Sequence, residues 1–383
     1  MQLMRASVLL LALAADNAAE APGEAPALPS DHQVRASELA NSLATKLAVY
    51  NQTDGGGNPD INEDATVIEA LIVSRHRIGE RDHLEFEAIT DVVSAASIKR
   101  NHNPAYRSLQ SGASGTVRVG AKVGYTRDFD ESALGGSVAF ANEYAYQSLG
   151  FGVHGSWSFN EENTTVTAAL QSYLDTVTMI RFDGTEDPEE SRDTYTISSS
   201  WVQLLSPESL MVLDVGLTQQ DGFLAGSFNS VFVSGVEQAE ALPDSRTRYA
   251  ATLRYKHALW ESDAAEAGLR YYGDDWGISG ITLDLRYFTY FDRKRWLLQP
   301  GYRLHIQTEA DHYRERWSTA EEFMTSDPDL GDFTGHSVSL HLHLLDAPFY
   351  DGLPASWDIG ATYATRDNGI DSFWIITGYR IHF

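Results

Sequence analysis

Several residue types and segments are missing from this 383-residue chain, and each absence excludes a class of structure. There is no cysteine, which excludes disulfide bonds, thiolate metal sites and cysteine nucleophiles. Beyond the N-terminus, no apolar run reaches the roughly 18 residues that a membrane-spanning helix needs. Glycine-rich phosphate loops and the HExxH and GxSxG motifs are also absent, so the sequence predicts no catalytic site of those classes.

Basic residues are scarce relative to acidic ones. The chain has 28 Lys and Arg against 54 Asp and Glu, which gives a formal net charge of -26. This balance makes nucleic acid a poor partner, because the phosphate backbone would be repelled. Many of the acids fall in four polar stretches, 54–64, 183–193, 237–244 and 309–332, which we interpret as solvated loops.

The N-terminus has the composition of a secretory signal. Arg5 supplies the positive region, and the run from Ala6 to Ala15 is apolar but too short to span a bilayer as a helix. We predict a signal peptide over residues 1–27, although the Ala-Leu-Ala sequence also allows cleavage near residue 15. A flexible N-terminal segment, 28–39, and a barrel, 40–383, would follow it.

What the chain does contain is an apolar–polar alternation with a period of two, which predicts β-strands with one oily face. In GTVRVGAKVGYT, Val117 and Val119 share one face while Arg118 and Lys122 share the other. The same alternation recurs in HSVSLHLHLL and in RTRYAATLRYKHA. The pattern predicts 16 strands, near 43–52, 66–78, 82–92, 115–126, 134–145, 148–159, 164–175, 194–205, 208–220, 246–258, 263–273, 278–291, 294–308, 336–346, 355–366 and 372–383.

An even number of strands joined by alternately short and long connections is typical of bacterial outer-membrane barrels. The connections predicted on the outer side are long and polar: 93–114, 176–193, 221–245 and 309–335. We therefore predict an all-β protein, a transmembrane antiparallel up-and-down β-barrel of about 16 strands with short periplasmic turns and long extracellular loops.

The last predicted strand also supports a location in the outer membrane. It reads SFWIITGYRIHF, and Tyr379, Ile381 and Phe383 share a face, a pattern that is similar to the assembly signal of outer-membrane barrels. Aromatic residues near several strand ends suit a membrane interface. The prediction is a porin-like barrel in the bacterial outer membrane, in contact with outer-membrane lipid and with both termini in the periplasm.

If the apolar face meets lipid, the alternate face lines the lumen. The lumen-lining candidates are Arg118, Lys122, Arg248, Arg254, Arg270, Arg286, Arg303, His341, His343 and Arg380. Two interpretations stay open at this point. The charges line an aqueous pore in which basic residues attract anions, or they pair across the interior and close it.

Two groups of residues have spacing that a metal ion could use. Asp60, Asn62 and Asp64 offer alternating oxygen ligands for calcium, but the rest of the calcium-loop pattern is missing. His341 and His343 lie two apart on one strand face. We favour a solvated acidic loop for the first group, and for the stretch TSDPDLGDF, and polar lumen residues for the second.

Several stretches resemble one family, the bacterial outer-membrane barrel proteins catalogued as domain-of-unknown-function 3570. The most specific are PDSRTR, RYYGDDWGISG and TEADHY, with SPESL and QQDGFL in support. TDVVSAAS departs from the family, because a Gly-Ala-Ser followed by Pro is expected where this chain has Ala95, Ala96, Ser97 and Ile98. The resemblance implies an outer-membrane barrel often encoded beside a small lipoprotein, a thioredoxin-like protein and a flavin-attaching enzyme.

The family stretches carry charged residues to the outer strand ends. The outer-rim candidates are Asp244, Arg246, Asp274, Asp275, Trp276, Glu309, Asp311 and His312. Such a cluster either fixes long loops over the mouth or binds a partner or ion, and loop anchoring is the simpler interpretation.

Three functions remain as hypotheses. The first is a channel, or a sheath for a periplasmic lipoprotein or redox protein, serving transport, envelope electron transfer or metal handling, with any redox cofactor on the partner. The second is a lipid hydrolase, which needs Ser, His and an acid or amide converging on the outer wall. The third is a non-conducting structural or assembly barrel.

Overall fold

The computed structural model describes residues 41–55, 64–95, 116–143, 146–181, 185–226, 229–347 and 352–383. The signal peptide and flexible segment predicted for residues 1–39 lie outside the described residues. The strands are β1 (Ser42–Asp54), β2 (Ala65–Arg77), β3 (Asp82–Ala95), β4 (Thr116–Asp128), β5 (Ser132–Glu143), β6 (Tyr146–Phe159), β7 (Thr164–Ile180), β8 (Glu186–Ser206), β9 (Ser209–Gly222), β10 (Ser230–Val233), β11 (Val236–Ala239), β12 (Ser245–Trp260), β13 (Asp263–Asp274), β14 (Ser279–Phe291), β15 (Trp296–Gln307), β16 (Phe333–Leu344), β17 (Ala355–Arg366) and β18 (Ile370–His382).

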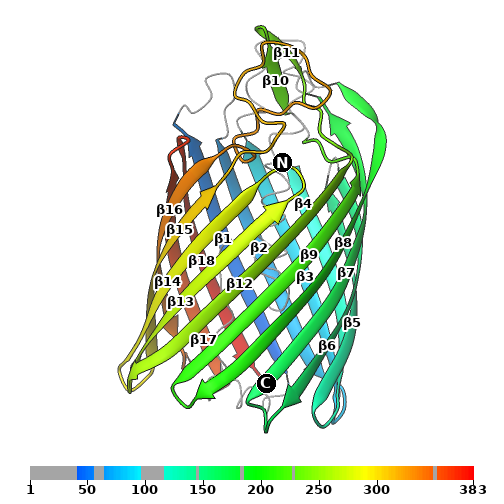
Figure 1. The fold of residues 1–383 in the computed structure, drawn as a ribbon. Helices are drawn as coiled ribbons and strands as arrows, with labels where there is room; N and C mark the ends of the chain where they lie inside the picture. The colour runs from blue at the N-terminus through cyan, green and yellow to red at the C-terminus, as the bar shows by residue number, and fades with distance from the viewer. Residues whose placement is uncertain are drawn as a thin grey trace.

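Sixteen of these strands form one closed antiparallel barrel, and β10 and β11 form a separate hairpin (Figure 1). Each barrel strand pairs with its neighbour in sequence, except that β9 pairs with β12 across the inserted hairpin. The barrel closes where β1 pairs with β18, from Ser42 opposite His382 to Asp54 opposite Ile370. The predicted fold class and strand count are confirmed.

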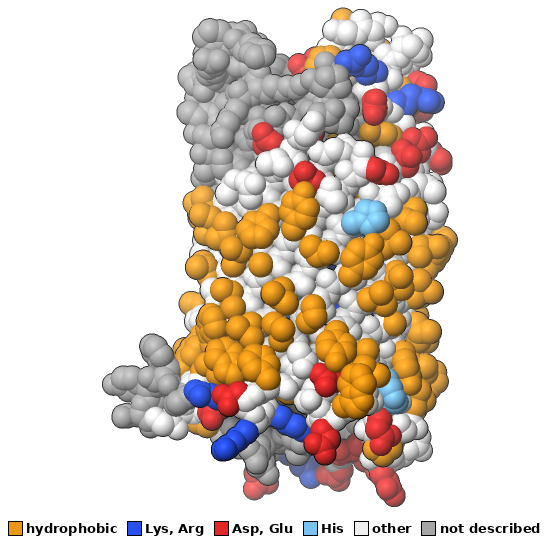
Figure 2. Space-filling model, turned by 90° about the vertical axis from the view of Figure 1, so that its left-hand side faces the viewer, with side chains coloured by type: hydrophobic (Ala, Val, Ile, Leu, Met, Phe, Trp, Pro, Cys, Tyr) orange, Lys and Arg blue, Asp and Glu red, His pale blue; other side chains and the backbone are white. Residues whose placement is uncertain are grey.

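The alternation in sequence becomes an inside and an outside of the wall. On β4, the side chains of Val117 and Val119 are 52% and 48% exposed, whereas Arg118 between them is 4% exposed. Successive strand residues point to opposite faces, so every strand contributes apolar side chains outward and polar ones inward. Figure 2 shows the result on one face of the wall, as a band of hydrophobic side chains with charged side chains above and below it.

The two ends of the barrel differ. At the turn end, which includes the C-terminus in Figure 1, the connections 78–81, 129–131 and 207–208 are short. At the opposite, loop end, the segments 223–244 and 308–332 are long and carry the β10–β11 hairpin. The described part of the chain contains no helix long and apolar enough to cross a membrane.

Two details of the predicted loops are wrong. The stretch 176–193 was expected to be a loop, but β7 continues to Ile180 and β8 begins at Glu186. The strands keep pairing above the apolar band, as in Val177 opposite Glu190, so a polar composition there reflects solvent exposure and not the loss of strand structure. The β10–β11 hairpin inside 221–245 was not predicted at all.

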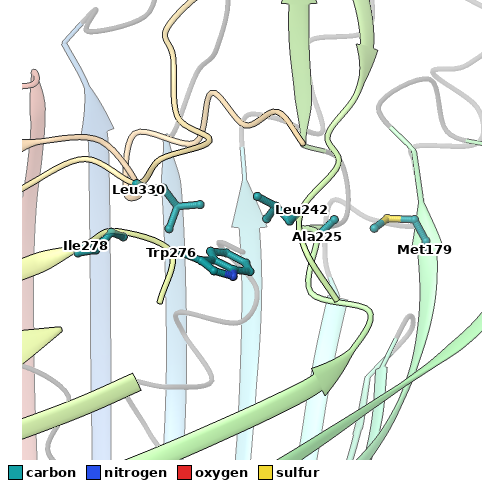
Figure 3. Close-up of a cluster of buried hydrophobic side chains, with 7 residues drawn as sticks. Met179, Ala225, Leu242, Trp276, Ile278 and Leu330 are labelled. Atoms are coloured by element: carbon teal, nitrogen blue, oxygen red, sulfur yellow. The ribbon is translucent and has the colours of Figure 1, made fainter. Parts of the chain in front are cut away.

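A compact apolar core lies at the loop end. It joins the β13–β14 turn to both long loops and to the end of β7, and Figure 3 shows its side chains spread across the loop end from Ile278 to Met179, with Trp276 between them. We call this the mouth cluster: Met179, Ala225, Leu242, Trp276, Ile278, Ala310 and Leu330. A second group, the hairpin cluster, consists of Val231, Val233, Trp317 and Met324. The long loops are therefore packed structures and not loose connections.

Candidate functional site

Ion pairs join neighbouring strands on the inward face of the barrel. Arg118 on β4 lies opposite Asp91 on β3 in the strand register, and its Nη2 atom is 2.6 Å from Asp91 Oδ2. The two side chains are 5% and 2% exposed. Arg303 on β15 pairs with Asp284 on β14 in the same way, also at 2.6 Å. Removing one partner of such a pair would leave the other charge unpaired in a shielded place. The pairs thus hold adjacent strands in register.

The other predicted lumen residues also occupy inward positions, between neighbours whose apolar side chains face outward. Three more of them form ion pairs with acids on adjacent strands. The Lys122 ammonium lies 3.7 Å from a Glu85 carboxylate oxygen and 3.6 Å from one of Glu87. The nitrogen–oxygen distances are 2.7 Å for Arg254 with Asp214 and 3.7 Å for Arg286 with Glu266. Charge pairing along the wall therefore accounts for most of the predicted lumen charges, without pairing across the axis.

One sector of the inner wall, from β12 to β18, carries more basic than acidic side chains. Its inward basic residues are Arg246, Arg248, Arg254, Lys256, Arg270, Arg286, Arg303, Arg366 and Arg380, and its inward acidic residues are Glu266, Asp274, Asp284 and Asp358. The interior of this sector is consequently positive although the whole chain is acidic. A wall of this sign attracts anions into the lumen.

The candidate metal residues do not form a metal centre in the described parts of the chain, where no group of three or more His, Asp or Glu could hold an ion. His341 and His343 stack on the inward face of β16, with ring centroids 6.4 Å apart. Asp64 accepts a hydrogen bond from the Asp54 backbone N–H at 2.8 Å. Asp60 and Asn62 lie outside the described residues.

Asp274 is the centre of the outer-rim cluster. Its Oδ2 atom accepts hydrogen bonds from Arg246 Nε at 3.0 Å and from the Tyr272 hydroxyl at 2.9 Å. Its Oδ1 atom accepts the backbone N–H groups of Trp276 at 3.1 Å and Ile278 at 2.9 Å. This buried carboxylate is fully occupied in fixing the β13–β14 turn to β12.

The indole of Trp276 continues the same network. Its Nε1 donates to the Ser245 carbonyl at 2.9 Å, and the Arg246 guanidinium lies 4.3 Å from the ring centroid. Asp275 Oδ1 accepts the Thr247 N–H at 2.9 Å, which ties the other side of the turn to β12. These contacts fix the β13–β14 turn to β12, and the long loops pack on this turn.

The remaining rim candidates are spread along the loops. The Asp311 N–H donates to the Trp276 carbonyl at 2.8 Å, and the His312 ring lies 5.3 Å from that of Phe323. Asp244 is exposed, and its carbonyl accepts the Gly222 N–H at 2.7 Å. Glu309 is also exposed. The structure therefore brings together Arg246, Asp274, Asp275, Trp276 and Asp311, and leaves the other three at its edge.

A buried acidic residue that the sequence did not single out connects the two long loops. Glu240 is 4% exposed, and its carboxylate accepts the Gly226 N–H at 2.8 Å and the Thr325 hydroxyl at 2.6 Å. Asn229 Nδ2 donates hydrogen bonds to the carboxylates of both Glu240, at 3.3 Å, and Asp327, at 3.4 Å. Burial, and secondly the Asp327 carboxylate, raise the pKa of Glu240.

The interpretation of 237–244 and 309–332 as solvated acidic loops is wrong at these positions. Glu240, Asp327 and Asp329 are all buried. Asp329 pairs with Arg366 on β17 at 2.7 Å, and the Asp327 carboxylate accepts the Asp329 N–H at 2.9 Å. Each acid is buried because a donor from another segment meets it, and composition alone does not show these partners.

The outward face holds a serine–histidine pair that the sequence could not single out. Ser209 Oγ lies 2.8 Å from His257 Nδ1, and Tyr255 OH lies 3.1 Å from the same oxygen. A pocket of ≈ 490 Å³ begins beside His257 and runs along β12 to β15 over Ala265 and Ala267. A second pair, Ser74 with His76 at 2.7 Å, lies on β2. Within the described residues, neither imidazole bonds to a carboxylate or amide side chain.

Comparisons with known proteins agree with this architecture. The model of a family described as "Protein of unknown function (DUF3570)" matches residues 2–347. A bacterial polysaccharide outer membrane secretin aligns with a TM-score of 0.51 and 10% identity, over 89% of this chain and 98% of that one. A search of curated proteins finds no match to the sequence.

Two porin structures are also similar. OprD from Pseudomonas aeruginosa aligns with a TM-score of 0.45 and 10% identity, over 90% of this chain and 94% of that one. A BenF-like porin from Pseudomonas fluorescens Pf-5 aligns with a TM-score of 0.45 and 9% identity, over 90% and 98%. At 10% identity, the likeness to the secretin concerns the fold alone, which is that of an outer-membrane barrel.

Proposed function

Because the chain belongs to the DUF3570 family and folds as a closed 16-strand barrel, we propose that it is an outer-membrane channel for small hydrophilic anions. The observation that carries the proposal is the positive inner wall from β12 to β18. Barrels of 16 strands leave room for an aqueous channel, and a positive wall lowers the energy of anions within it. The loop end faces the outside in this proposal, and both termini face the periplasm.

The proposal is tested by reconstituting the purified barrel in planar bilayers under a KCl gradient. We expect discrete conductance steps and a reversal potential shifted toward that of chloride. Replacing Arg286 and Arg303 with glutamine is expected to reduce the shift, because it removes two inward positive charges. A cation-selective conductance would contradict the proposed selectivity. Complete absence of conductance would favour the non-conducting structural barrel.

The partner-based forms of the hypothesis are tested separately. The sheath for a periplasmic lipoprotein or redox protein, with electron transfer or metal handling, comes from the family resemblance and stays a prediction. Co-purification of the barrel from its native membrane is the measurement. A lipoprotein or redox protein recovered in fixed proportion to the barrel would favour the sheath over the open channel.

The Ser209–His257 pair favours a second candidate function, lipid hydrolysis on the outer wall. The hydroxyl lies within hydrogen-bond distance of a basic nitrogen, and the pocket beside His257 opens on the face that meets acyl chains. Hydrolysis of a fluorogenic phospholipid by purified protein tests it. Ser209→Ala is expected to abolish the activity, whereas Ser74→Ala, in the pair away from this pocket, is not. Failure of the wild-type protein to hydrolyse the lipid would exclude this function.

A further inference from the structure

Arg248 differs from the other arginines near it on the inner wall. It lies on β12, opposite Thr218 of β9 and Asp274 of β13 in the strand register. Asp274 would be its natural partner, but that carboxylate already accepts Arg246, Tyr272 and two backbone N–H groups. Arg248 therefore faces an acid that has no acceptor capacity left for it.

Other arginines in this part of the wall have carboxylate partners. Arg192 on β8 pairs with Asp175 at 2.8 Å, and Arg254, six residues further along β12, pairs with Asp214 at 2.7 Å. Arg248 forms no ion pair with any residue that the structure describes, and its Nε is buried without a hydrogen-bond partner. Arg248 is thus a positive charge of the inner wall that no carboxylate of the described residues pairs with.

The surroundings of Arg248 are rich in neutral hydrogen-bonding groups. The hydroxyls of Thr196 and Thr218 lie 3.0 Å apart in the same row of the sheet, and Gln220 donates to Thr194 at 3.1 Å in the next row. The mouth cluster lies at the loop end of the barrel, where β12 begins. An unpaired guanidinium with a buried Nε costs stability, and side chains of this kind inside membrane proteins typically mark ligand pathways.

We propose that Arg248, with the inward threonine hydroxyls of β8 and β9, forms a binding subsite for the oxyanion group of a small solute. The inference rests on the proposed channel function, because the lumen is what brings the solute to this site. The planar guanidinium fork favours a carboxylate or phosphate over chloride, since it donates two parallel hydrogen bonds to two oxygens. Hydroxyl donors beside it add contacts to further oxygens of the same group.

Equilibrium binding tests the subsite without requiring conductance. Inorganic phosphate and succinate are titrated calorimetrically into the purified barrel in detergent at low ionic strength, with glycerol as the uncharged comparison. We expect saturable binding of the two anions, weakened at least about tenfold by Arg248→Gln and less by Arg248→Lys. Arg81→Gln, which removes an exposed arginine from the turn end, is the matched control and is expected to bind as the wild type does.

Two further measurements keep the result interpretable. Arg248→Gln is expected to unfold at the same or a higher temperature than the wild type, because it removes an uncompensated charge. Equal phosphate affinity in Arg248→Gln and wild type, or no saturable binding by the wild type, would overturn the subsite. If the wild type binds phosphate through Arg248 but carries no current in planar bilayers, the proposed channel fails while the subsite stands.

Discussion

The side chains at the rim show how one buried residue can serve several segments. Asp274 is completely buried and joins Arg246 on β12 to the turn that carries Trp276. In such a network every donor has an acceptor, so the desolvation of each charge is offset. The same saturation leaves Arg248 without a partner. Arg246 and Arg248, two residues apart on the inward face of β12, therefore compete for a single carboxylate, and Arg246 holds it.

Removing Arg246 should be far more harmful than removing an exposed arginine. Arg246→Gln is expected to lower the free energy of unfolding by about 3–5 kcal/mol, because it leaves the buried Asp274 carboxylate without its cation. Denaturant unfolding in lipid vesicles measures the change. Arg293→Gln, in the exposed β14–β15 turn, is the control and should change stability by less than about 0.5 kcal/mol. A similar small effect of both variants would show that the rim pair is not a source of stability.

Glu240 gives the contact between the two long loops a dependence on pH. Because burial raises its pKa above the ordinary value of 4.5, the folded loops hold a proton that the unfolded loops have released. The stability that this group contributes is present below pH 4.5 and is lost as pH rises toward the raised pKa. The Asp327 carboxylate faces it, and Asn229 and Thr325 are the neutral donors around it.

Hydrogen exchange of 223–244, followed from pH 4 to 8 with correction for intrinsic rates, measures this effect. Protection in the wild type is expected to decrease with rising pH. Glu240→Gln is expected to flatten the profile, because the amide keeps one acceptor and carries no charge. Glu237→Gln, which changes an exposed side chain on β11, should retain the wild-type profile. A wild-type profile that is already flat would refute the role of Glu240.

At the residue scale, the sequence predicted positions better than partners. Period two assigns Arg118 and Arg303 to the polar face of their strands, because side-chain direction in a strand depends only on local geometry. It could not show that Asp274 has no capacity left for Arg248, because the sequence does not reveal which nearby donors the carboxylate accepts. Nor could it select Ser209, whose imidazole partner is 48 positions away in the chain.

At the scale of elements, the β10–β11 hairpin is held by tertiary packing. Each of its strands has only four residues, too few for a hairpin to be stable alone. Its apolar side packs on Trp317, and the backbone of Val233 forms a bridge to the same residue. The loop 308–332 therefore acts as the second layer that the hairpin needs.

Removing the Trp317 side chain should release the hairpin while the barrel remains closed. Trp317→Ala is expected to destabilise the contact by about 3–5 kcal/mol, because a large buried side chain is replaced by a cavity. Limited proteolysis should then cut within 223–244 and 308–332. Val236→Ala, whose side chain is 61% exposed on β11, should remain resistant. Resistance of Trp317→Ala as well would mean that other contacts suffice.

The strands of the wall were predictable and the loop elements were not, for a physical reason. Each wall strand separates lipid from lumen, so its sequence must alternate over ten or more residues. The hairpin has no such constraint, and its local signal is the Ser234–Gly235 pair after the short apolar run Val231–Val233. Both residues of the pair have positive φ. Likewise, most side chains of β8 from Glu186 to Ser191 are exposed to solvent, so that stretch reads as a loop although it is paired.

At the scale of the whole molecule, charge is divided by location. The net charge of -26 belongs to the chain as a whole, while the inner wall from β12 to β18 is positive. The short turns and long loops at opposite ends, together with the apolar band between them, were foreseen from the sequence. How far the loops cover the mouth could not be foreseen, because their core forms only when distant segments meet.

The loop 308–332 spans much of the mouth, and this gives the last prediction. Asp329 anchors it to Arg366 of β17, while Leu330 packs in the mouth cluster that extends to Met179 of β7. Replacing 309–331 with a short glycine–serine turn should leave the barrel closed, because β15 and β16 stay paired up to Gln307 opposite Phe333. Single-channel conductance in planar bilayers is then expected to rise, with unchanged heat-modifiable migration on gels as the check on folding. An unchanged conductance in a correctly folded variant would place the ion path clear of this loop, and would move the narrowest point down to the charged inner wall.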